Sequence, residues 1–251
     1  MTAKTPAGVL RAALLHTRDV AASARHYQSV FGWTAVPDAA GTSFTLGGQR
    51  VAAACAVVAG VDGWVPYVGV EDVDDGAARA VRSGATVLEG RADASPGIRR
   101  RLVRDPGGAV LGLCGLDDAA AVELIDEPGS VWWMEVLSHT PARARDFYGG
   151  LLQWQFTEKP LPPHASYLVG RRSGIEAGGI LPIGRGWGTP SRWQLLFHVD
   201  DLARSTQQVV DAGGRVEFGP LDVPSAGVTT SVRDPHGSLY VLMQPHPQSA
   251  A

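Results

Sequence analysis

Residues Gly129 to Phe156 read GSVWWMEVLSHTPARARDFYGGLLQWQF, and this stretch decides the fold of the chain. Its first part, VWWMEVLS, mixes β-branched and aromatic residues in the way that strands do. Thr140 and Pro141 then have the residue types of a helix N-cap and of the first helical position. Apolar residues recur at helical spacing after them, and a second extended run begins at Trp154. The stretch therefore predicts a strand, a helix and a second strand.

An earlier segment, VLRAALLHTRDVAASARHYQSVFGWT at residues 9–34, is a second copy of this pattern. Tyr27 corresponds to Tyr148 and Trp33 to Trp154 at one common offset. Such a match in residue type and order indicates an internal duplication.

Two later landmarks extend the duplication. VEDVDDGAARAVRSGATV at 70–87 matches VDDLARSTQQVVDAGGRV at 199–216, and the turn RDPGG at 104–108 matches RDPHG at 233–237. Their offset is larger, which predicts insertions in the second half around 160–163 and 184–190. Each half then contains two βαβββ units, an α+β arrangement. We predict an N-terminal domain at 1–117, a linker at 118–129 and a C-terminal domain at 130–251.

Composition limits the classes of function. The 251 residues carry a formal net charge of −3 with a pI near 6.1, which gives no basic surface for nucleic acid or for an anionic membrane. The sequence has no apolar stretch of spanning length and no secretory signal pattern. Its two cysteines, Cys55 and Cys114, have no C-x-x-C spacing and indicate a reducing compartment. These features predict a cytoplasmic protein, a monomer or homodimer, that binds a small molecule.

The tandem βαβββ units, the Ala-Arg-x-Phe-Tyr helix before a Trp, the Val-Asp-Asp-Leu helix start and the Asp-Pro-x-Gly turn together resemble the vicinal oxygen chelate superfamily. This superfamily includes glyoxalase I, extradiol dioxygenases, fosfomycin-modifying enzymes and bleomycin-resistance proteins. The resemblance covers nearly the whole chain. The pattern that begins at Trp133 looks like that of the two-domain glyoxalase-like proteins of actinobacteria. The resemblance implies two domains in which a curved mixed sheet surrounds a cleft. It does not choose among reactions, because one fold carries many chemistries.

Metal-dependent members of the superfamily place two His and one Glu at fixed positions, and the resemblance transfers those positions to this chain. The matching residues are Ala12, Val65 and Gly112 in the first half, and Trp133, Gln194 and Val241 in the second. Among these, Gln194 alone has an oxygen donor, and one amide oxygen does not hold a divalent ion. The sequence therefore predicts neither a metal site nor a cofactor.

Strand alternation predicts what lines the second cleft instead. The residues on the same face as Trp133 and Gln194 include Glu135, Arg192, His198, Val241 and Met243. Trp187 and Trp193 flank the connector GRGWGTPSRW and are predicted to stack on a ligand at the mouth. In the first half, His16 and Tyr67 are the weaker candidates, and that half is either a roomier pocket or purely structural.

Two functions remain open from the residues. One is a metal- and cofactor-independent enzyme in which Glu135 and His198 act as acid and base on an aromatic or polycyclic metabolite, by isomerisation, cyclisation, dehydration or epoxide opening. The other is a resistance protein that sequesters a drug-like compound without catalysis. A metal-dependent glyoxalase or dioxygenase is a third. Structural alternatives also exist, since Glu135 can pair with Arg192 across the sheet and His198 can be solvated at a strand end.

Overall fold

The computed structural model describes residues 6–38, 41–88, 99–118, 120–161 and 165–247. The first half of the chain forms eight strands and two helices, and the second half repeats this order with one added 3₁₀ turn. The elements of the first half are β1 (Leu10–Thr17), α1 (Val20–Phe31), β2 (Thr34–Asp38), β3 (Gly41–Leu46), β4 (Gln49–Ala56), β5 (Gly63–Val70), α2 (Val73–Arg82), β6 (Thr86–Leu88), β7 (Arg100–Arg104) and β8 (Val110–Gly115). Those of the second half are β9 (Val131–Ser138), α3 (Pro141–Leu152), β10 (Gln155–Leu161), β11 (Ala165–Arg172), β12 (Ile175–Pro182), η1 (Arg185–Trp187), β13 (Arg192–His198), α4 (Leu202–Asp211), β14 (Arg215–Val223), β15 (Gly227–Arg233) and β16 (Leu239–Pro245).

Each half supplies one eight-stranded mixed sheet, with the orders β2-β3-β4-β1-β5-β8-β7-β6 and β10-β11-β12-β9-β13-β16-β15-β14. Within every βαβββ unit the strand before the helix pairs in parallel with the last strand, as β1 does with β4 and β13 with β16. The remaining strands of each unit pair antiparallel. This confirms the predicted α+β fold of four βαβββ units.

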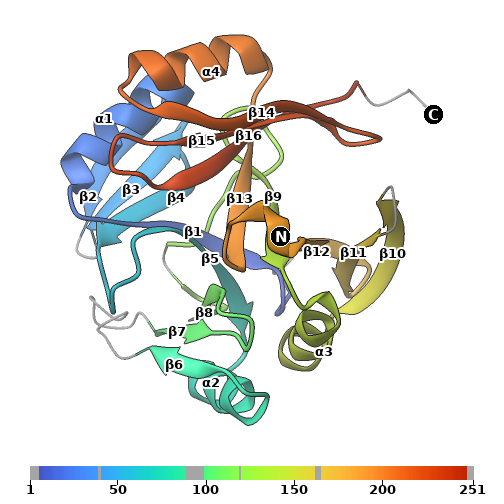
Figure 1. Ribbon diagram of the computed structural model, residues 1–251. Coiled ribbons are helices and arrows are strands. Elements are labelled where there is room, and N and C mark those ends of the chain that lie inside the picture. Colours follow the sequence, from blue (N-terminus) through green and yellow to red (C-terminus); the bar gives the residue numbers. More distant parts are fainter. Residues whose placement is uncertain (1–5, 39–40, 89–98, 119, 162–164, 248–251) are drawn as a thin grey trace. The chain divides into compact units, whose positions relative to one another are not determined.

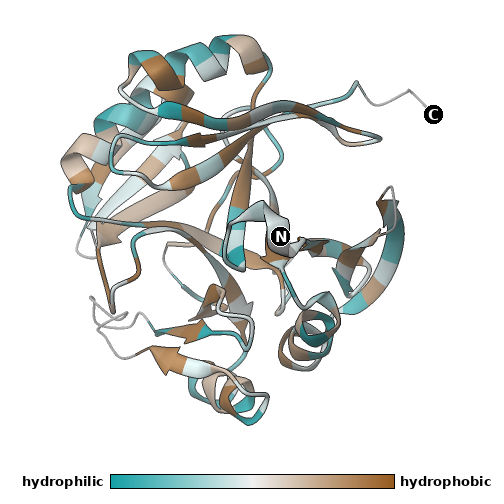
Figure 2. Cartoon of the chain, viewed as in Figure 1, coloured by the Kyte–Doolittle hydropathy of each residue, from teal (hydrophilic) through white to brown (hydrophobic). Residues whose placement is uncertain are grey.

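The helix starts follow from short acidic caps at three of the four helices. The side chains of Asp19, Asp72 and Asp201 each accept a hydrogen bond from a backbone N–H in the first helical turn. Thr140 occupies the predicted N-cap position of α3, but its side chain makes no capping bond, and Pro141 fixes the first turn instead. In Figure 2 hydrophilic and hydrophobic residues alternate along the helices, as expected for helices with one buried face.

The contacts of the chain group into two compact units, and each unit takes one βαβββ segment from each half. Unit 1 comprises Met1–Ala12, Val65–Ala121 and Met134–Gln194, and unit 2 comprises Ala13–Trp64, Val122–Trp133 and Leu195–Ala251. Contacts therefore combine the first segment with the fourth and the second with the third. The predicted division at 118–129 describes the covalent repeat, and its role as a boundary between independent domains stays a prediction.

In unit 2, the hydroxyl of Tyr27 joins the two halves of the sequence. It donates to Asp234 Oδ2 at 3.1 Å and accepts from Trp64 Nε1 at 2.8 Å. Both hydrogen bonds are buried. Asp234 Oδ1 meanwhile accepts from the backbone N–H groups of His236 and Ser238, so the same carboxylate shapes the Asp-Pro turn. Figure 1 shows α4 over β14, β15 and β16 in this unit, with α1 beside it.

Unit 1 repeats this arrangement with the duplicated residues. Tyr148 Oη donates to Asp105 Oδ2 at 2.7 Å and accepts from Trp193 Nε1 at 2.9 Å. Asp105 Oδ1 accepts from the N–H groups of Gly107 and Ala109. The duplicated tyrosine and the aspartate of the duplicated turn are therefore bonded to each other in both units.

The duplicated tryptophans also join segments distant in sequence. Trp33 Nε1 donates to the carbonyl of Gly129 at 2.7 Å, and Trp154 Nε1 donates to the carbonyl of Gly8 at 2.6 Å. Both indoles are nearly fully buried. No helix among the described residues has the length and apolar character needed to cross a membrane.

Candidate functional site

The candidate site is centred on Glu135, a carboxylate on β9 that is 8% exposed. Tyr167 on β11 donates its hydroxyl to Oε2 at 2.7 Å, and Gln194 on β13 donates Nε2 to Oε1 at 2.7 Å. Three strands of unit 1 thus hold one carboxyl group, with one donor on each oxygen. This satisfies the rule that a buried charged group needs hydrogen-bond partners.

Burial raises the pKa of Glu135 above its ordinary value, since loss of water disfavours the charged form. The hydrogen bonds from Tyr167 and Gln194 and the positive charge of Arg192 act in the opposite direction and leave a net increase. A carboxyl group with a raised pKa exchanges its proton closer to neutral pH. This is the property required of a general acid or base.

Gly179 explains how Tyr167 reaches Glu135 across an intervening strand. β12 lies between β11 and β9, and the register pairs Gly179 with Glu135. A Cβ at Gly179 would lie 1.9 Å from the Tyr167 hydroxyl oxygen, so the phenol passes directly over this glycine. Sequence reasoning missed Tyr167. The signal that was present is the pair of glycines at 178–179 inside an otherwise regular strand.

Arg192 and Thr189 extend the polar group around Gln194. Arg192 donates a hydrogen bond from Nη1 to Thr189 Oγ1 and another from Nη2 to Gln194 Oε1, the latter at 3.5 Å. The carbonyl of Thr189 accepts from His139 Nε2 at 2.8 Å, which ties the connector after η1 to the end of β9. The sequence suggested a direct pair between Glu135 and Arg192. In the structure Tyr167 and Gln194 donate the hydrogen bonds to Glu135, and the charge of Arg192 acts on it electrostatically.

The predicted apolar residues gather in unit 2. Leu196, Val241 and Met243 form a buried cluster, and Trp133 packs against it while remaining partly exposed. Strand β9 carries both Trp133 and Glu135, and β13 carries both Gln194 and Leu196, in each case two residues apart. Residues two apart on a strand face the same side. The polar group belongs to unit 1 and the apolar cluster to unit 2.

His198 lies at the other end of β13 and does not join the polar group of Glu135. Its Nδ1 is 3.3 Å from the carbonyl oxygen of Asp126, and the ring is half-buried. His198 belongs to unit 2, whereas Glu135 and Gln194 belong to unit 1.

The two tryptophans predicted at the mouth have different positions. Trp187, in η1, is 60% exposed and remains available for stacking on a ligand. Trp193 is 5% exposed and donates to Tyr148, with its ring 5.1 Å from the tyrosine ring. The prediction for Trp193 is therefore wrong. As the neighbour of Gln194 on a strand it faces the opposite side, into the core.

In the first half the candidate positions are closed by packing. The ring of Tyr67 covers Gly112, because a Cβ there would lie 2.3 Å from Tyr67 Cδ1. Tyr67 is 1% exposed, and the guanidinium carbon of Arg100 lies 5.6 Å from its ring centroid. Arg100 in turn makes a buried two-point ion pair with Asp118, both bonds at 2.7 Å. These contacts favour a structural role for Tyr67. His16 is likewise buried, and its Nδ1 lies 3.5 Å from Cys55 Sγ.

The residues at the metal-ligand positions of the superfamily do not suit a divalent ion. Tyr67 fills the space above Gly112, and the amide oxygen of Gln194, the single oxygen donor, faces the cationic Arg192 and accepts from its Nη2 at 3.5 Å. Among the described residues no group of three or more His, Cys, Asp or Glu side chains is arranged to hold a metal. We therefore derive no chemistry from a metal at these positions.

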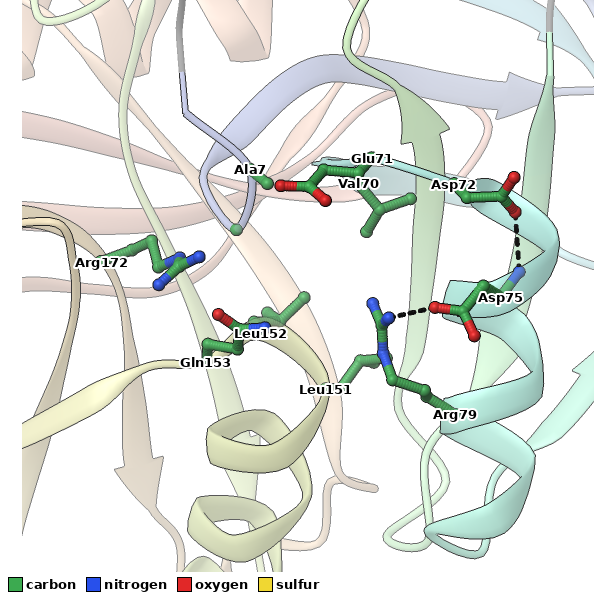
Figure 3. A pocket seen from close by; sticks show the side chains of 11 residues that line it. Ala7, Val70, Glu71, Asp72, Asp75, Arg79, Leu151, Leu152, Gln153 and Arg172 are labelled. Carbon is green, nitrogen blue, oxygen red and sulfur yellow. Dashed lines mark hydrogen bonds and ion pairs between the residues drawn. The ribbon is translucent and has the colours of Figure 1, made fainter.

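Two surface cavities lie away from the Glu135 group. One in unit 1, of about 110 Å³, is bordered by the first turn of α2 and the end of α3, and Figure 3 shows its charged lining. Asp72 there caps α2 through the N–H of Asp75, and Asp75 pairs with Arg79. The cavity of unit 2, of about 340 Å³, lies where α1 ends and α4 begins, at the corresponding place in the repeat. Neither lining contains a predicted site residue.

The four βαβββ units and the duplicated Tyr, Trp and Asp-Pro landmarks define a member of the vicinal oxygen chelate superfamily. A family model described as a glyoxalase-like domain matches residues 12–114. The chain is 30% identical to the putative glyoxylase CFP32 of Mycobacterium tuberculosis, over 93% of this chain and 94% of that protein. It is also 30% identical to the anthracycline biosynthesis protein DnrV of Streptomyces peucetius, over 92% and 90% of the two chains. The chain therefore belongs to the glyoxalase-like family.

A solved structure shows the same fold at low sequence identity. The 2,3-dioxygenase LapB of Pseudomonas sp. KL28 has a TM-score of 0.64 and 14% identity, covering 98% of this chain and 96% of its own. At this identity the similarity concerns the fold alone.

Proposed function

We propose that this protein acts on an aromatic or polycyclic small molecule of natural-product type, by acid–base catalysis at Glu135. The observation that carries the proposal is the buried carboxyl group itself, held between Tyr167 and Gln194 with a raised pKa. Burying such a group costs free energy, which is better explained by use in a proton transfer than by packing alone.

The apolar residues of unit 2 support this class of ligand. Trp133 on β9 is partly exposed, and it packs against the buried cluster of Leu196 on β13 and Val241 and Met243 on β16. Relatives named for anthracycline biosynthesis, DnrV and DauV, share about 30% of their residues with this chain. Anthracyclines are polycyclic aromatic compounds, and ligands of that shape bind mainly to apolar and aromatic side chains with a few polar groups.

The proposed chemistry is a proton transfer at a carbon or oxygen of the ligand. Glu135 removes or supplies the proton, while Tyr167 and Gln194 hold its carboxyl group in one orientation. Isomerisation, cyclisation, dehydration and epoxide opening all require such a step. We propose that it proceeds without a metal, because the metal-ligand positions of the superfamily carry unsuitable residues. We further propose that the protein uses no cofactor and is a cytoplasmic monomer or homodimer.

A sequestering protein is the second candidate, and the exposure of Trp187 favours it. An indole that is 60% exposed beside a glycine-rich connector suits stacking on a flat drug-like compound. Such a protein needs aromatic area and gains little from a carboxyl group.

Two variants distinguish the candidates. Glu135→Gln keeps the shape of the side chain and removes its proton exchange, and Trp187→Ala removes the exposed indole. The assay incubates the protein with a panel of anthracyclines and polycyclic aromatic ketones, measures binding by tryptophan fluorescence and detects conversion by mass spectrometry. For the enzyme we expect Glu135→Gln to lower turnover by about 10²-fold or more with little change in binding. For a sequestering protein Trp187→Ala costs about 1–3 kcal/mol of affinity and Glu135→Gln costs little.

Glu176→Gln is the matched control, because Glu176 is an exposed glutamate on β12 that pairs with Arg171 at the surface. It loses the same charge without touching the site and should leave binding and turnover unchanged. If Glu135→Gln behaves like this control while Trp187→Ala weakens binding, the catalytic proposal is refuted.

A further inference from the structure

His16 and Cys55 lie against each other in unit 2, outside the group around Glu135. Strands β1 and β4 run parallel, and their register pairs His16 with Cys55. The Cys55 sulfur lies 3.5 Å from His16 Nδ1, within hydrogen-bond range for a thiol. A thiol and an imidazole nitrogen are thus in hydrogen-bond contact, which is the arrangement that activates cysteine in enzymes.

Cys55 is a partly exposed residue, whereas His16 is buried. Cys55 is half-buried near the end of β4, and His16 is 1% exposed. The residue of β4 that shares a face with Cys55 is Ala53, two positions earlier. On the β3 side stands Gly41, where a Cβ would lie 3.3 Å from Cys55 Cα and 2.2 Å from the Ala54 carbonyl oxygen. Ala53 and Gly41 are small and uncharged, so neither repels an uncharged reagent that approaches Cys55.

The other cysteine has the opposite surroundings. Cys114 is fully buried on β8 and directs its thiol to the carbonyl of Val68 at 3.7 Å. Burial raises the pKa of the Cys114 thiol far above its ordinary value, so this thiol stays protonated and unreactive. Cys114 therefore serves as an internal control for the reactivity of Cys55.

The charged and titratable groups of the elements beside Cys55 have partners of their own. Asp38 at the end of β2 and Arg50 on β4 both bond the hydroxyl of Ser43 on β3. On α1, which also packs on β4, the ring nitrogens of His26 contact the carbonyl of Ala212 and the hydroxyl of Tyr240, and Arg25 is exposed. His16 is the ring that meets the thiol.

We propose that Cys55 is a nucleophilic thiol activated by His16, and that it forms a thioether with uncharged carbon electrophiles of the enone or quinone class. The thiol proton passes to His16 Nδ1 as the sulfur bonds the β-carbon of the electrophile. The π electrons of the carbon–carbon double bond move to the carbonyl oxygen and give an enolate. The enolate carbon then takes the proton back from His16, which leaves a neutral imidazole and a saturated thioether.

The test uses N-ethylmaleimide, a small uncharged enone-type reagent, with intact-mass measurement and peptide mapping of the full-length native protein. We expect one adduct, on Cys55, with Cys114 labelled only after unfolding. The pH midpoint of the labelling rate should lie below the value of about 8.5 for a free cysteine. His16→Gln should move this midpoint up towards 8.5 and slow labelling at pH 6 by roughly 3- to 10-fold, allowing for the higher intrinsic reactivity of a more basic thiolate.

His246→Gln is the control, because His246 is an exposed histidine that contacts Asp222. It should leave the midpoint unchanged. The wild-type midpoint against a free cysteine peptide decides the matter even if His16→Gln fails to fold. A wild-type midpoint at or above 8.5, labelling of Cys114 ahead of Cys55, or equal midpoints for His16→Gln and His246→Gln would each overturn the proposal.

Discussion

The two tyrosine hydroxyls that join the halves of the sequence allow a paired stability experiment. Tyr148→Phe removes a donor to Asp105 and an acceptor for Trp193, and Tyr27→Phe removes a donor to Asp234 and an acceptor for Trp64. Phenylalanine fills the same ring volume, so the change is confined to hydrogen bonds. All of these partners are buried.

The expected loss follows from the bonds removed. A hydrogen bond to a charged group contributes about 1.5–3 kcal/mol, and a buried indole N–H left without an acceptor costs about 1 kcal/mol or more. Each carboxylate keeps its bonds to two backbone N–H groups, which limits the damage. We therefore expect the free energy of unfolding to fall by about 2–4 kcal/mol. Tyr148→Phe should cost at least as much as Tyr27→Phe, because its bond to the carboxylate is 2.7 Å long against 3.1 Å.

Equilibrium unfolding in urea, followed by circular dichroism, measures both variants. The midpoint should shift without a change in the slope of free energy against urea, because the surface exposed on unfolding is unaltered. Ser29→Ala removes an exposed hydroxyl that bonds the carbonyl of Arg25, and it should cost less than about 0.5 kcal/mol. If both tyrosine variants lose no more than this control, the hydroxyl–carboxylate bonds do not stabilise the units and our reasoning fails.

Further outcomes concern the site. Because the pKa of Glu135 is raised in the folded protein, the folded state binds this proton more tightly than the unfolded chain, whose glutamates titrate near 4.5. The unfolding free energy of wild type relative to Glu135→Gln should therefore decrease as pH rises from about 4 through the folded pKa, and then stay constant. The slope of this decrease should be at most about 1.4 kcal/mol per pH unit. Urea unfolding at several pH values measures the difference, and an increase with pH would contradict the raised pKa. Tyr167→Phe removes a bond that lowers the same pKa, so the decrease should extend to higher pH in the same assay, and an unchanged profile would count against the bond. Trp193→Phe should destabilise the protein by about 1–3 kcal/mol whereas Trp187→Ala should stay within about 0.5 kcal/mol, as thermal unfolding would show, and equal effects would refute their assignment to core and surface. Removing divalent ions with a chelator should leave ligand binding and activity unchanged, and elemental analysis that found one tightly held ion per chain would contradict our proposal.

The repeat made the fold predictable from the sequence. Tyr27, Tyr148 and the Asp-Pro turns recur in order, and each marks a place where the backbone or a core contact allows few alternatives. The same landmarks did not reveal that the contacts combine the first βαβββ segment with the fourth. Internal similarity shows which segments are alike, but pairing partners depend on side-chain contacts such as Tyr27 with Asp234, which similarity alone does not specify.

The candidate site was predicted in part. Strand alternation placed Glu135 and Gln194 on one face, and the structure joins them by a hydrogen bond. Tyr167 was missed because its contact crosses an intervening strand over Gly179, a relationship that a pattern within one strand does not contain. Trp193 was misplaced although alternation excludes it from the face of Gln194. Trp64, its counterpart in the repeat, also lies in the core and bonds a tyrosine hydroxyl.

The bonds between distant segments affect when the protein can fold during its synthesis. Tyr27 cannot form its hydrogen bond until Asp234 has been synthesised, and the indole of Trp33 cannot form its bond until Gly129 has been synthesised. A nascent chain that has emerged only as far as the linker therefore presents two incomplete units, each lacking a βαβββ segment. Contacts between residues so far apart in sequence slow folding, and exposed apolar strands in the meantime favour aggregation. We expect the isolated first half, residues 1–117, to be a client of chaperones rather than a folded domain, although its sequence looks like a complete one.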